Sequence, residues 1–302
     1  MSRPRRVVIT ESSPRDGLQS LGVFVATDAK IGLINDLAVA GLASFDAVSF
    51  VSPTAVPQMA DAADVVAGVA RAGIAVNALV PNLRGLEGAV AAGVDGIGVL
   101  TASSDAFNLA NINATVDESM ERIRQILDAV PETMTVRGYV STMTHCPYDG
   151  PTDPDRVANL ANSLIEWGCD EVFLGETIGM GSTADVSRVL DAVLALVPVD
   201  RVGVHLHDTY GQAVANLSVA IERGVARLDS SAGGLGGCPY APGAGGNVAT
   251  EDVGWFLDGL GIEHGVDLAE VAHVANEFCR RHRLDYRSKA GQAMLAAAAR
   301  NG

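Results

Sequence analysis

Two histidines one residue apart, His205 and His207, carry the strongest chemical signal in the chain. They close a short apolar run that begins at Val202, and Asp208 follows them directly. Side chains alternate between the two faces of a strand, so these imidazoles would point the same way. Two imidazoles on one face can bind one cation. A pair of hydrogen-bonded interior histidines is the structural alternative, and this pair alone does not decide between them.

A second group of reactive side chains lies near the N-terminus, in the stretch ESSPRDGLQ from Glu11 to Gln19. Asp16 offers a hard oxygen ligand for a metal ion. Arg15 offers a fixed positive charge and a planar fork that can bind an oxyanion. An exposed turn with a local Arg–Asp pair is the structural alternative, and taken alone it is the commoner explanation.

A third segment, residues 232–247, is rich in glycine and reads AGGLGGCPYAPGAGGN. Glycine lets backbone N–H groups approach a ligand closely. The segment lacks the GK[ST] ending of a phosphate-binding loop. Cys238 is a candidate proton donor that moves in with substrate, and Asn247 offers a neutral oxygen ligand. The alternative is a flexible connection that carries an inert thiol.

Together, Asp16, His205, His207 and Asn247 would leave two positions of an octahedral metal site open. A mixed set of oxygen and imidazole ligands favours Mg²⁺ or Mn²⁺ over Zn²⁺ or Co²⁺. With neutral imidazoles, the ion and Asp16 leave one positive charge. The sequence therefore predicts a divalent-metal site for an anionic substrate that chelates through oxygen.

The elements that must position these residues alternate between short β-branched runs and longer amphipathic segments. Such alternation predicts parallel strands joined by helical crossovers. The predicted strands are Val7–Thr10, Phe45–Val51, Ile74–Val80, Gly96–Leu100, Met134–Ser141, Glu171–Glu176, Val202–His207 and Ala226–Asp229. A segment long enough for a helix lies between most of them, for example Asp28–Ala40, Ala60–Ala72, Val116–Ala129, Asp155–Trp167, Ala184–Leu196 and Gln212–Arg223.

Eight strand–helix repeats predict a (β/α)₈ TIM barrel, with an open doubly wound sheet as the alternative. Each reactive segment follows a predicted strand, so all three would meet at the C-terminal mouth of the barrel. Residues 250–302 are predicted to form two extra C-terminal helices packed on the barrel, which makes 1–302 a single domain. Thr27 or Asp28 is expected to cap the first helix.

Composition narrows the possible partners. The formal net charge is −15, and only Lys30 and Lys289 are lysines. Such a chain repels nucleic acid and anionic membranes, so neither is expected as a partner. No apolar stretch approaches the roughly 18 residues of a membrane span. The cysteines are widely spaced without a zinc pattern, which favours reduced thiols in a cytoplasmic protein.

Several motifs resemble the hydroxymethylglutaryl-CoA lyase family of DRE-TIM metallolyase barrels. They are PRDGLQ, SFVSP with PQM, GYVS followed by CPY, LGxTIGxG, HLHDTYGQA and GGLGGCPYAPGAGGN, spread from Val7 to Gly265. The resemblance implies Asp16, His205, His207 and Asn247 as metal ligands. It implies Arg15 and Cys238 as catalytic groups, and His205 as the base, assisted or oriented by Asp46 or Glu176.

The resemblance also implies an activity. It is the metal-dependent retro-Claisen cleavage of a 3-hydroxyacyl-CoA, most directly 3-hydroxy-3-methylglutaryl-CoA to acetyl-CoA and acetoacetate. A homodimer and a place in leucine degradation are expectations at the level of the family.

Three positions depart from the family pattern. Asp46 stands where glutamate is usual, Glu176 stands where aspartate is usual, and His145 stands where a small residue is usual. Because each carboxylate moves by one methylene, the acyl pocket is open to change. The alternatives are a sister lyase for citramalyl-CoA or a longer 3-hydroxy-3-alkylglutaryl-CoA, a condensing enzyme of the isopropylmalate synthase type, and a catalytically silent barrel that serves as a binding protein.

Overall fold

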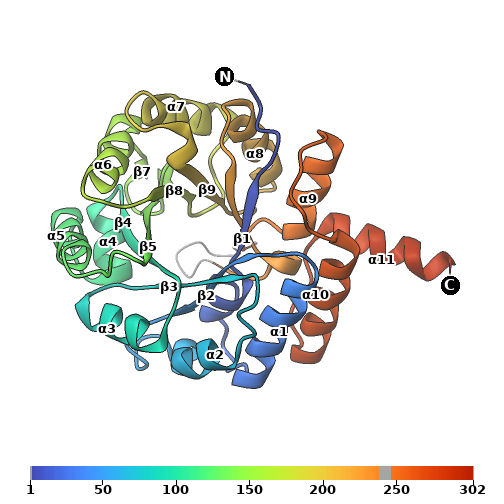
Figure 1. Cartoon of the computed structure of the whole chain (residues 1–302). Coiled ribbons are helices and arrows are strands. Elements are labelled where there is room, and N and C mark those ends of the chain that lie inside the picture. The colour runs from blue at the N-terminus through green and yellow to red at the C-terminus, as the bar shows by residue number, and fades with distance from the viewer. Residues whose placement is uncertain (1, 238–245, 302) are drawn as a thin grey trace.

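In this computed structural model, which describes residues 2–237 and 246–301, eight parallel strands close into a barrel (Figure 1). The strands follow one another around the ring in the order β1-β10-β9-β8-β5-β4-β3-β2. The prediction of a (β/α)₈ barrel is confirmed. The strands are β1 (Val8–Glu11), β2 (Ser44–Ser49), β3 (Ala75–Leu79), β4 (Gly96–Ala102), β5 (Thr135–Ser141), β8 (Glu171–Glu176), β9 (Val202–Leu206) and β10 (Arg227–Ser230).

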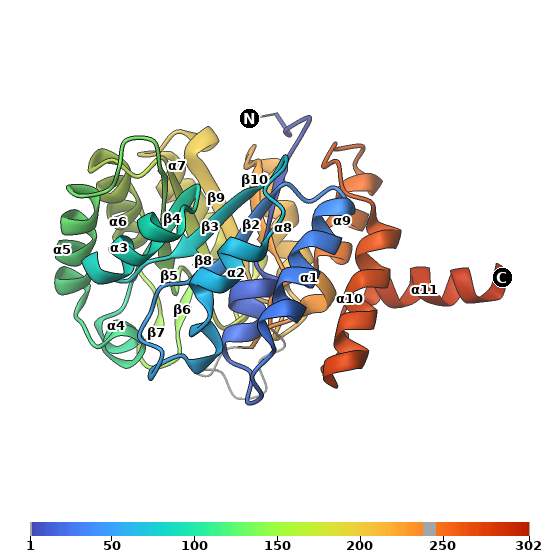
Figure 2. The same cartoon turned by 60° about the horizontal axis from the view of Figure 1, so that its bottom comes forward.

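Helices surround this barrel on the outside (Figure 2). They are α1 (Thr27–Val39), α2 (Ala62–Gly68), α3 (Leu83–Ala92), α4 (Asp105–Ile112), α5 (Val116–Leu127), α6 (Pro154–Glu166), α7 (Thr183–Leu194), α8 (Ala213–Glu222), α9 (Thr250–Gly259), α10 (Leu268–His282) and α11 (Lys289–Asn301). A small antiparallel hairpin of β6 (His145–Cys146) and β7 (Gly150–Pro151) interrupts the pattern after β5.

The examples named from the sequence did not include two helices, α3 and α4, and one C-terminal helix was not predicted. The side chain of Asn82 accepts from the N–H of Gly85 to start α3, and Ser104 accepts from Phe107 to start α4. In the described part of the chain three helices rather than two follow Ala249, because Arg283 takes a left-handed conformation that ends α10 and Lys289 starts α11. Two side-chain caps and the left-handed backbone of Arg283 thus set helix boundaries that the hydrophobic periodicity did not reveal.

The predicted cap of α1 was wrong. The helix begins with Ala26 as its N-cap, and no side chain caps it. Thr27 instead donates its hydroxyl hydrogen to Asp61, at 2.8 Å, on the loop before α2. The hydroxyl therefore ties two segments together instead of satisfying the helix end.

Alternate residues of each strand face two different environments. Val202, Val204 and Leu206 of β9 belong to the apolar core between the strands and the helices. The intervening His205 faces the barrel interior, where its ring approaches Asp16. His205 therefore points into the interior, and that is where the predicted site must lie.

The C-terminal helices pack on one side of the barrel. Helix α10 contacts α1 and α9, and α11 contacts α9 and α10 before it extends away from the body (Figure 1). Among the described helices, none has the length and apolar character needed to cross a bilayer. Cys146, Cys169 and Cys279 are free and buried thiols.

The turn after α1 depends on a glycine. Gly41 has φ +97°, and a Cβ there would collide with the carbonyl of Gly265 ahead of α10. We expect Gly41→Ala to lower the free energy of unfolding by at least about 2 kcal/mol, since left-handed strain and the clash add. Denaturant-induced unfolding measures this. Gly32→Ala, inside α1 with open space around it, is the control and should stabilise by up to about 1 kcal/mol. Equal midpoints for both variants would contradict the expectation.

Candidate metal centre and active site

Asp16, His205 and His207 converge at the C-terminal mouth of the barrel. Asp16 lies in a short π-helical turn, Ser13–Gly17, that follows β1, whereas His205 lies in β9 and His207 just beyond it. One ligand atom from each lies within 4.8 Å of the others. The two imidazole Nε2 atoms are 3.2 Å apart, and Oδ2 of Asp16 is 3.8 Å from His205 and 3.9 Å from His207. The donor atoms thus surround one point.

Asn247 completes the predicted set. Its side-chain amide donates to Oδ2 of Asp16 at 2.8 Å, and its backbone pairs with His207. The oxygen of that amide is the atom that would ligate an ion, and a half-turn of the amide group presents it to the same point. All four predicted metal ligands are therefore brought together, from three segments that lie far apart in the sequence.

A partner that sequence reasoning missed, Asp229 at the inner face of β10, fixes the orientation of His205. Its Oδ2 lies 3.1 Å from Nδ1 of His205, and the Asp229 side chain is fully buried. A carboxylate at Nδ1 holds the proton there and leaves the lone pair on Nε2, which faces Asp16 and His207. The donor set fits a divalent ion, because the atoms that converge are lone pairs and a carboxylate oxygen.

The electrostatics of the cluster keep Asp16 and His207 in the forms that bind a cation, whereas the pKa of His205, which burial would lower, is raised by Asp229 and Asp16. Burial would raise the pKa of Asp16, but Arg15 and the nearby histidines outweigh it and lower that pKa to about 2. Burial, helped by His205, lowers the pKa of His207 to about 4. At neutral pH, Asp16 is ionised and His207 is a neutral imidazole, as metal ligands must be.

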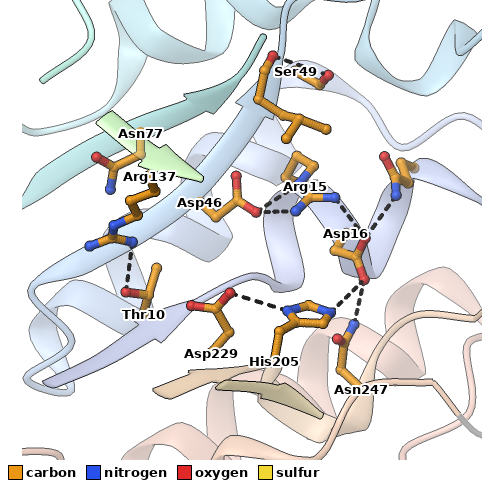
Figure 3. A network of polar contacts seen from close by, with 12 residues as sticks. Thr10, Arg15, Asp16, Asp46, Ser49, Asn77, Arg137, His205, Asp229 and Asn247 are labelled. Atoms are coloured by element: carbon orange, nitrogen blue, oxygen red, sulfur yellow. Dashed lines mark hydrogen bonds and ion pairs between the residues drawn. The ribbon is translucent and has the colours of Figure 1, made fainter. Parts of the chain in front are cut away.

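Arg15 lies between two carboxylates, as Figure 3 shows. Its Nη1 donates to Oδ1 of Asp16 at 2.7 Å, and its Nε donates to Oδ2 of Asp46 at 2.7 Å. Burial would lower the pKa of Arg15, but Asp46 and Asp16 raise it above its usual range. Asp46 precedes a register shift in the pairing of β2 with β3, an irregularity common beside active sites. Despite its shorter stem, Asp46 reaches the arginine directly.

The structure does not bring Glu176 into this cluster. Its Oε1 accepts from the hydroxyl of Thr144 at 2.6 Å and from the N–H of Gly181 at 3.1 Å. It therefore closes the loop that follows β8. His145 is half-buried in the β6–β7 hairpin. Cys238 lies outside the described residues.

A charged residue below the cluster, Arg137 of β5, was also missed. Its Nη1 donates to the hydroxyl of Thr10 at 2.9 Å, and its Nε lies 3.2 Å from Glu171. Arg137 is the only charged residue of β5, and Asp229 follows Arg227 by two positions in β10. A charged side chain inside a predicted buried strand, at a position that alternation turns inward, is the signal that would have found them.

Comparison with known proteins agrees with this geometry. Residues 6–277 match the model of the HMGL-like family. A protein of Pseudomonas aeruginosa named 3-hydroxy-3-isohexenylglutaryl-CoA/hydroxy-methylglutaryl-CoA lyase is 45% identical over 99% of this chain and 100% of its own. The chain belongs to the HMGL-like family. It is a lyase by that membership, and the resemblance inferred from its motifs is confirmed.

Other HMGL-like relatives extend the match. The mitochondrial hydroxymethylglutaryl-CoA lyase of Arabidopsis thaliana is 47% identical over 92% of this chain, which spans 60% of that protein. The crystal structure of hydroxymethylglutaryl-CoA lyase from Pseudomonas aeruginosa superposes with a TM-score of 0.95 at 45% identity, covering 98% of this chain and 100% of that one. The HMG-CoA lyase of Acinetobacter baumannii, solved with coenzyme A and 3-methylmalate, gives a TM-score of 0.91 at 34% identity over 96% and 95% of the two chains.

The contact between Asp229 and His205 generates a prediction. We expect Asp229→Asn to weaken Mn²⁺ binding by about 10–100-fold, because the imidazole loses the carboxylate that fixes its tautomer and orientation. A titration of free Mn²⁺ by electron paramagnetic resonance measures the affinity. Asp117→Asn, on the exposed face of α5, is the control and should bind as the parent does. An unchanged affinity in folded Asp229→Asn would contradict this role.

Proposed function

We propose that this chain cleaves 3-hydroxy-3-methylglutaryl-CoA to acetyl-CoA and acetoacetate in a divalent-metal-dependent retro-Claisen reaction. The observation that carries the proposal is the convergence of Asp16, His205 and His207 beside Arg15 at one point in the barrel mouth. The full-length relative from Pseudomonas aeruginosa is named as a lyase for this ester, which supports the same substrate class.

The proposed reaction begins at the hydroxyl on C3 of the substrate. A divalent ion held by Asp16, His205, His207 and Asn247 would supply Lewis acidity to a hydroxyl beside it. We propose His205 as the base that takes the hydroxyl proton on Nε2, with Asp229 stabilising the imidazolium through Nδ1. Because Nε2 carries the only free lone pair of the ring, His205 would be a ligand only before it takes the proton, and Asp16, His207 and Asn247 would hold the ion while it does.

The bond between C2 and C3 breaks next, and its electron pair passes to the thioester fragment as an enolate. We propose that Arg15 stabilises the enolate oxygen, since its guanidinium lies buried against the cluster and keeps its charge. Asp46 orients Arg15 by accepting from Nε. Glu176 would act through the loop that it closes. Cys238 would return a proton to the enolate carbon, which completes acetyl-CoA.

The identity of the ion is proposed from the chemistry of the ligand atoms. Carboxylate and amide oxygens beside imidazoles favour Mg²⁺ or Mn²⁺ as the ion. The homodimer and the place in leucine degradation are carried by the family resemblance alone, whereas the proposed cytoplasmic location rests on the widely spaced cysteines, which form no zinc pattern. Sedimentation velocity of the purified chain tests the first of these.

A longer 3-hydroxy-3-alkylglutaryl-CoA is the second candidate substrate. The Pseudomonas aeruginosa relative is named for the isohexenyl ester as well as the methyl ester. Rates of free keto-acid release from hydroxymethylglutaryl-CoA, citramalyl-CoA and the isohexenyl ester rank the candidates directly. Absence of cleavage of every ester, in the presence of Mg²⁺ and Mn²⁺, would contradict the proposed function.

Removal of the ion is the direct test of metal dependence. We expect EDTA to abolish turnover of hydroxymethylglutaryl-CoA, and Mg²⁺ or Mn²⁺ to restore it. Asp16→Asn should lose activity and bind Mn²⁺ weakly, because the amide carries no charge and Arg15 loses one of its two partners. Full activity of the EDTA-treated parent would refute the role of the ion.

Arg15→Lys tests oxyanion stabilisation without leaving Asp46 unpaired in the interior. Lysine keeps the charge but lacks the planar fork. We expect kcat to fall by about a hundredfold, which is the usual effect of losing one oxyanion donor, while Mn²⁺ binding stays. Arg71→Lys, in the exposed Arg71–Asp95 pair, is the matched control and should keep parental rates. A fall of less than about tenfold would count against Arg15.

A further inference from the structure

The barrel mouth has two unlike sides. The charged groups of the site come from β1, β2, β9 and β10, or from the segments that follow them. In the closed strand order, β3 stands directly across the ring from β9, and β4 stands directly across from β10. The side chains on β3 and β4 therefore face His205 and Asp229 across the interior.

At the C-terminal ends of β3 and β4 those facing side chains are apolar, whereas Asn77, earlier in β3, is polar and donates to the carbonyl of Phe45. On β3, Val76, Ala78 and Val80 pack in the outer core, which turns Leu79 inward at the C-terminal end. On β4, Ile97 and Val99 pack outward and Thr101 bonds to Ser119 of α5, which turns Gly98 and Leu100 inward. Leu79 and Leu100 are both half-buried, and neither packs against the outer core. We call Leu79, Gly98 and Leu100 the apolar wall.

Contacts at Gly98 place this wall close to the metal cluster. A Cβ on Gly98 would lie 2.9 Å from Cε2 of Tyr139 and 3.4 Å from Cδ1 of Leu79. The ring of Tyr139 in turn meets the ring of His205 edge-on, at a centroid separation of 6.5 Å. Leu79 and Tyr139 thus both lie against Gly98, and Tyr139 extends from there to the imidazole of His205.

We infer that the apolar wall seats the substituent on C3 of the substrate and sets which 3-hydroxy-3-alkylglutaryl-CoA esters react. The inference rests on the proposed function and names the part of the substrate that decides specificity. The hydroxyl, the carboxylate arm and the thioester arm on C3 all carry oxygen, so the charged side of the mouth takes them. The remaining substituent is a hydrocarbon, and the apolar wall is the side that can receive it without leaving a polar atom unpaired.

The volume of the side chains in the apolar wall then determines how long a substituent on C3 can be. The leucine side chains occupy volume that a longer alkyl chain would need, while a methyl group fits beside them. Each methylene that a pocket gains or excludes changes kcat/KM by roughly 10–200-fold. Shortening a leucine of the wall should favour long substituents, and enlarging it should favour the methyl group.

The experiment compares two esters on matched variants. The specificity ratio is kcat/KM for 3-hydroxy-3-isohexenylglutaryl-CoA divided by kcat/KM for hydroxymethylglutaryl-CoA. We expect Leu79→Ala and Leu100→Ala each to raise this ratio by about tenfold, and Leu79→Phe to lower it by a similar factor. Leu109→Ala, at an exposed position on α4, should leave it unchanged. Leu79→Val carries the same test if the alanine variant unfolds.

Mn²⁺ affinity separates specificity from general damage. Variants of the wall should bind Mn²⁺ as the parent does, because they leave the charged side intact. A ratio that stays within twofold of the parent in all folded wall variants would overturn the inference, although the proposed function would stand if the parent still cleaves hydroxymethylglutaryl-CoA. A parent that cleaves neither ester overturns the proposed function, and the inference falls with it.

Discussion

Burial of three carboxylates inside one barrel is the constraint on which the structure of the site depends. Asp16, Asp46 and Asp229 are all removed from solvent, and an unpaired buried charge costs several kcal/mol. Arg15 bridges Asp16 and Asp46, and Arg137 lies below them. With neutral imidazoles, three carboxylates and Arg15 leave two negative charges, because Arg137 is paired with Glu171. A divalent cation cancels these charges, which removes the repulsion that an anionic substrate would otherwise meet at the mouth.

Closure of the sheet is what makes this arrangement possible. The charged residues come from both ends of the chain, and β1 meets β10 only when the ring is complete. Asp46 and Asp229 therefore depend on partners from other segments, Arg15 and His205. A sheet that did not close would leave these buried carboxylates without those partners.

Much of this could be predicted from the sequence because two simple rules apply to it. Buried parallel strands are short apolar runs, and the runs near Val7, Phe45 and Val202 were recognisable as such. The C-terminal ends of such strands and the loops after them meet at one mouth, so the sequence alone could place Asp16, His205 and Asn247 together. Alternation also turned His205 and His207 to the same side.

The parts that were missed depend on tertiary contacts with no local pattern. Asp229 and Arg137 acquire their roles from partners on other strands, so their sequence neighbourhood marks only an unusual buried charge. Glu176 follows the outward-facing Leu174 by two positions, and alternation alone would have turned it away from the interior. Glu176 was assigned a catalytic role from a sequence motif, and a motif does not specify which residues a side chain contacts in the fold.

The charged groups and the apolar wall lie on different strands, so a substitution can change one without changing the other. A change on β3 or β4 alters the volume beside C3 but removes no partner from Arg15, Asp16 or Asp229. A change on the charged side alters both the binding of an ion and the balance of buried charge. Substrate range can therefore vary among barrels of this type while the chemistry stays fixed. On the charged side, aspartate at position 46 in place of the usual glutamate keeps its contact with Arg15, so the balance of buried charge is preserved.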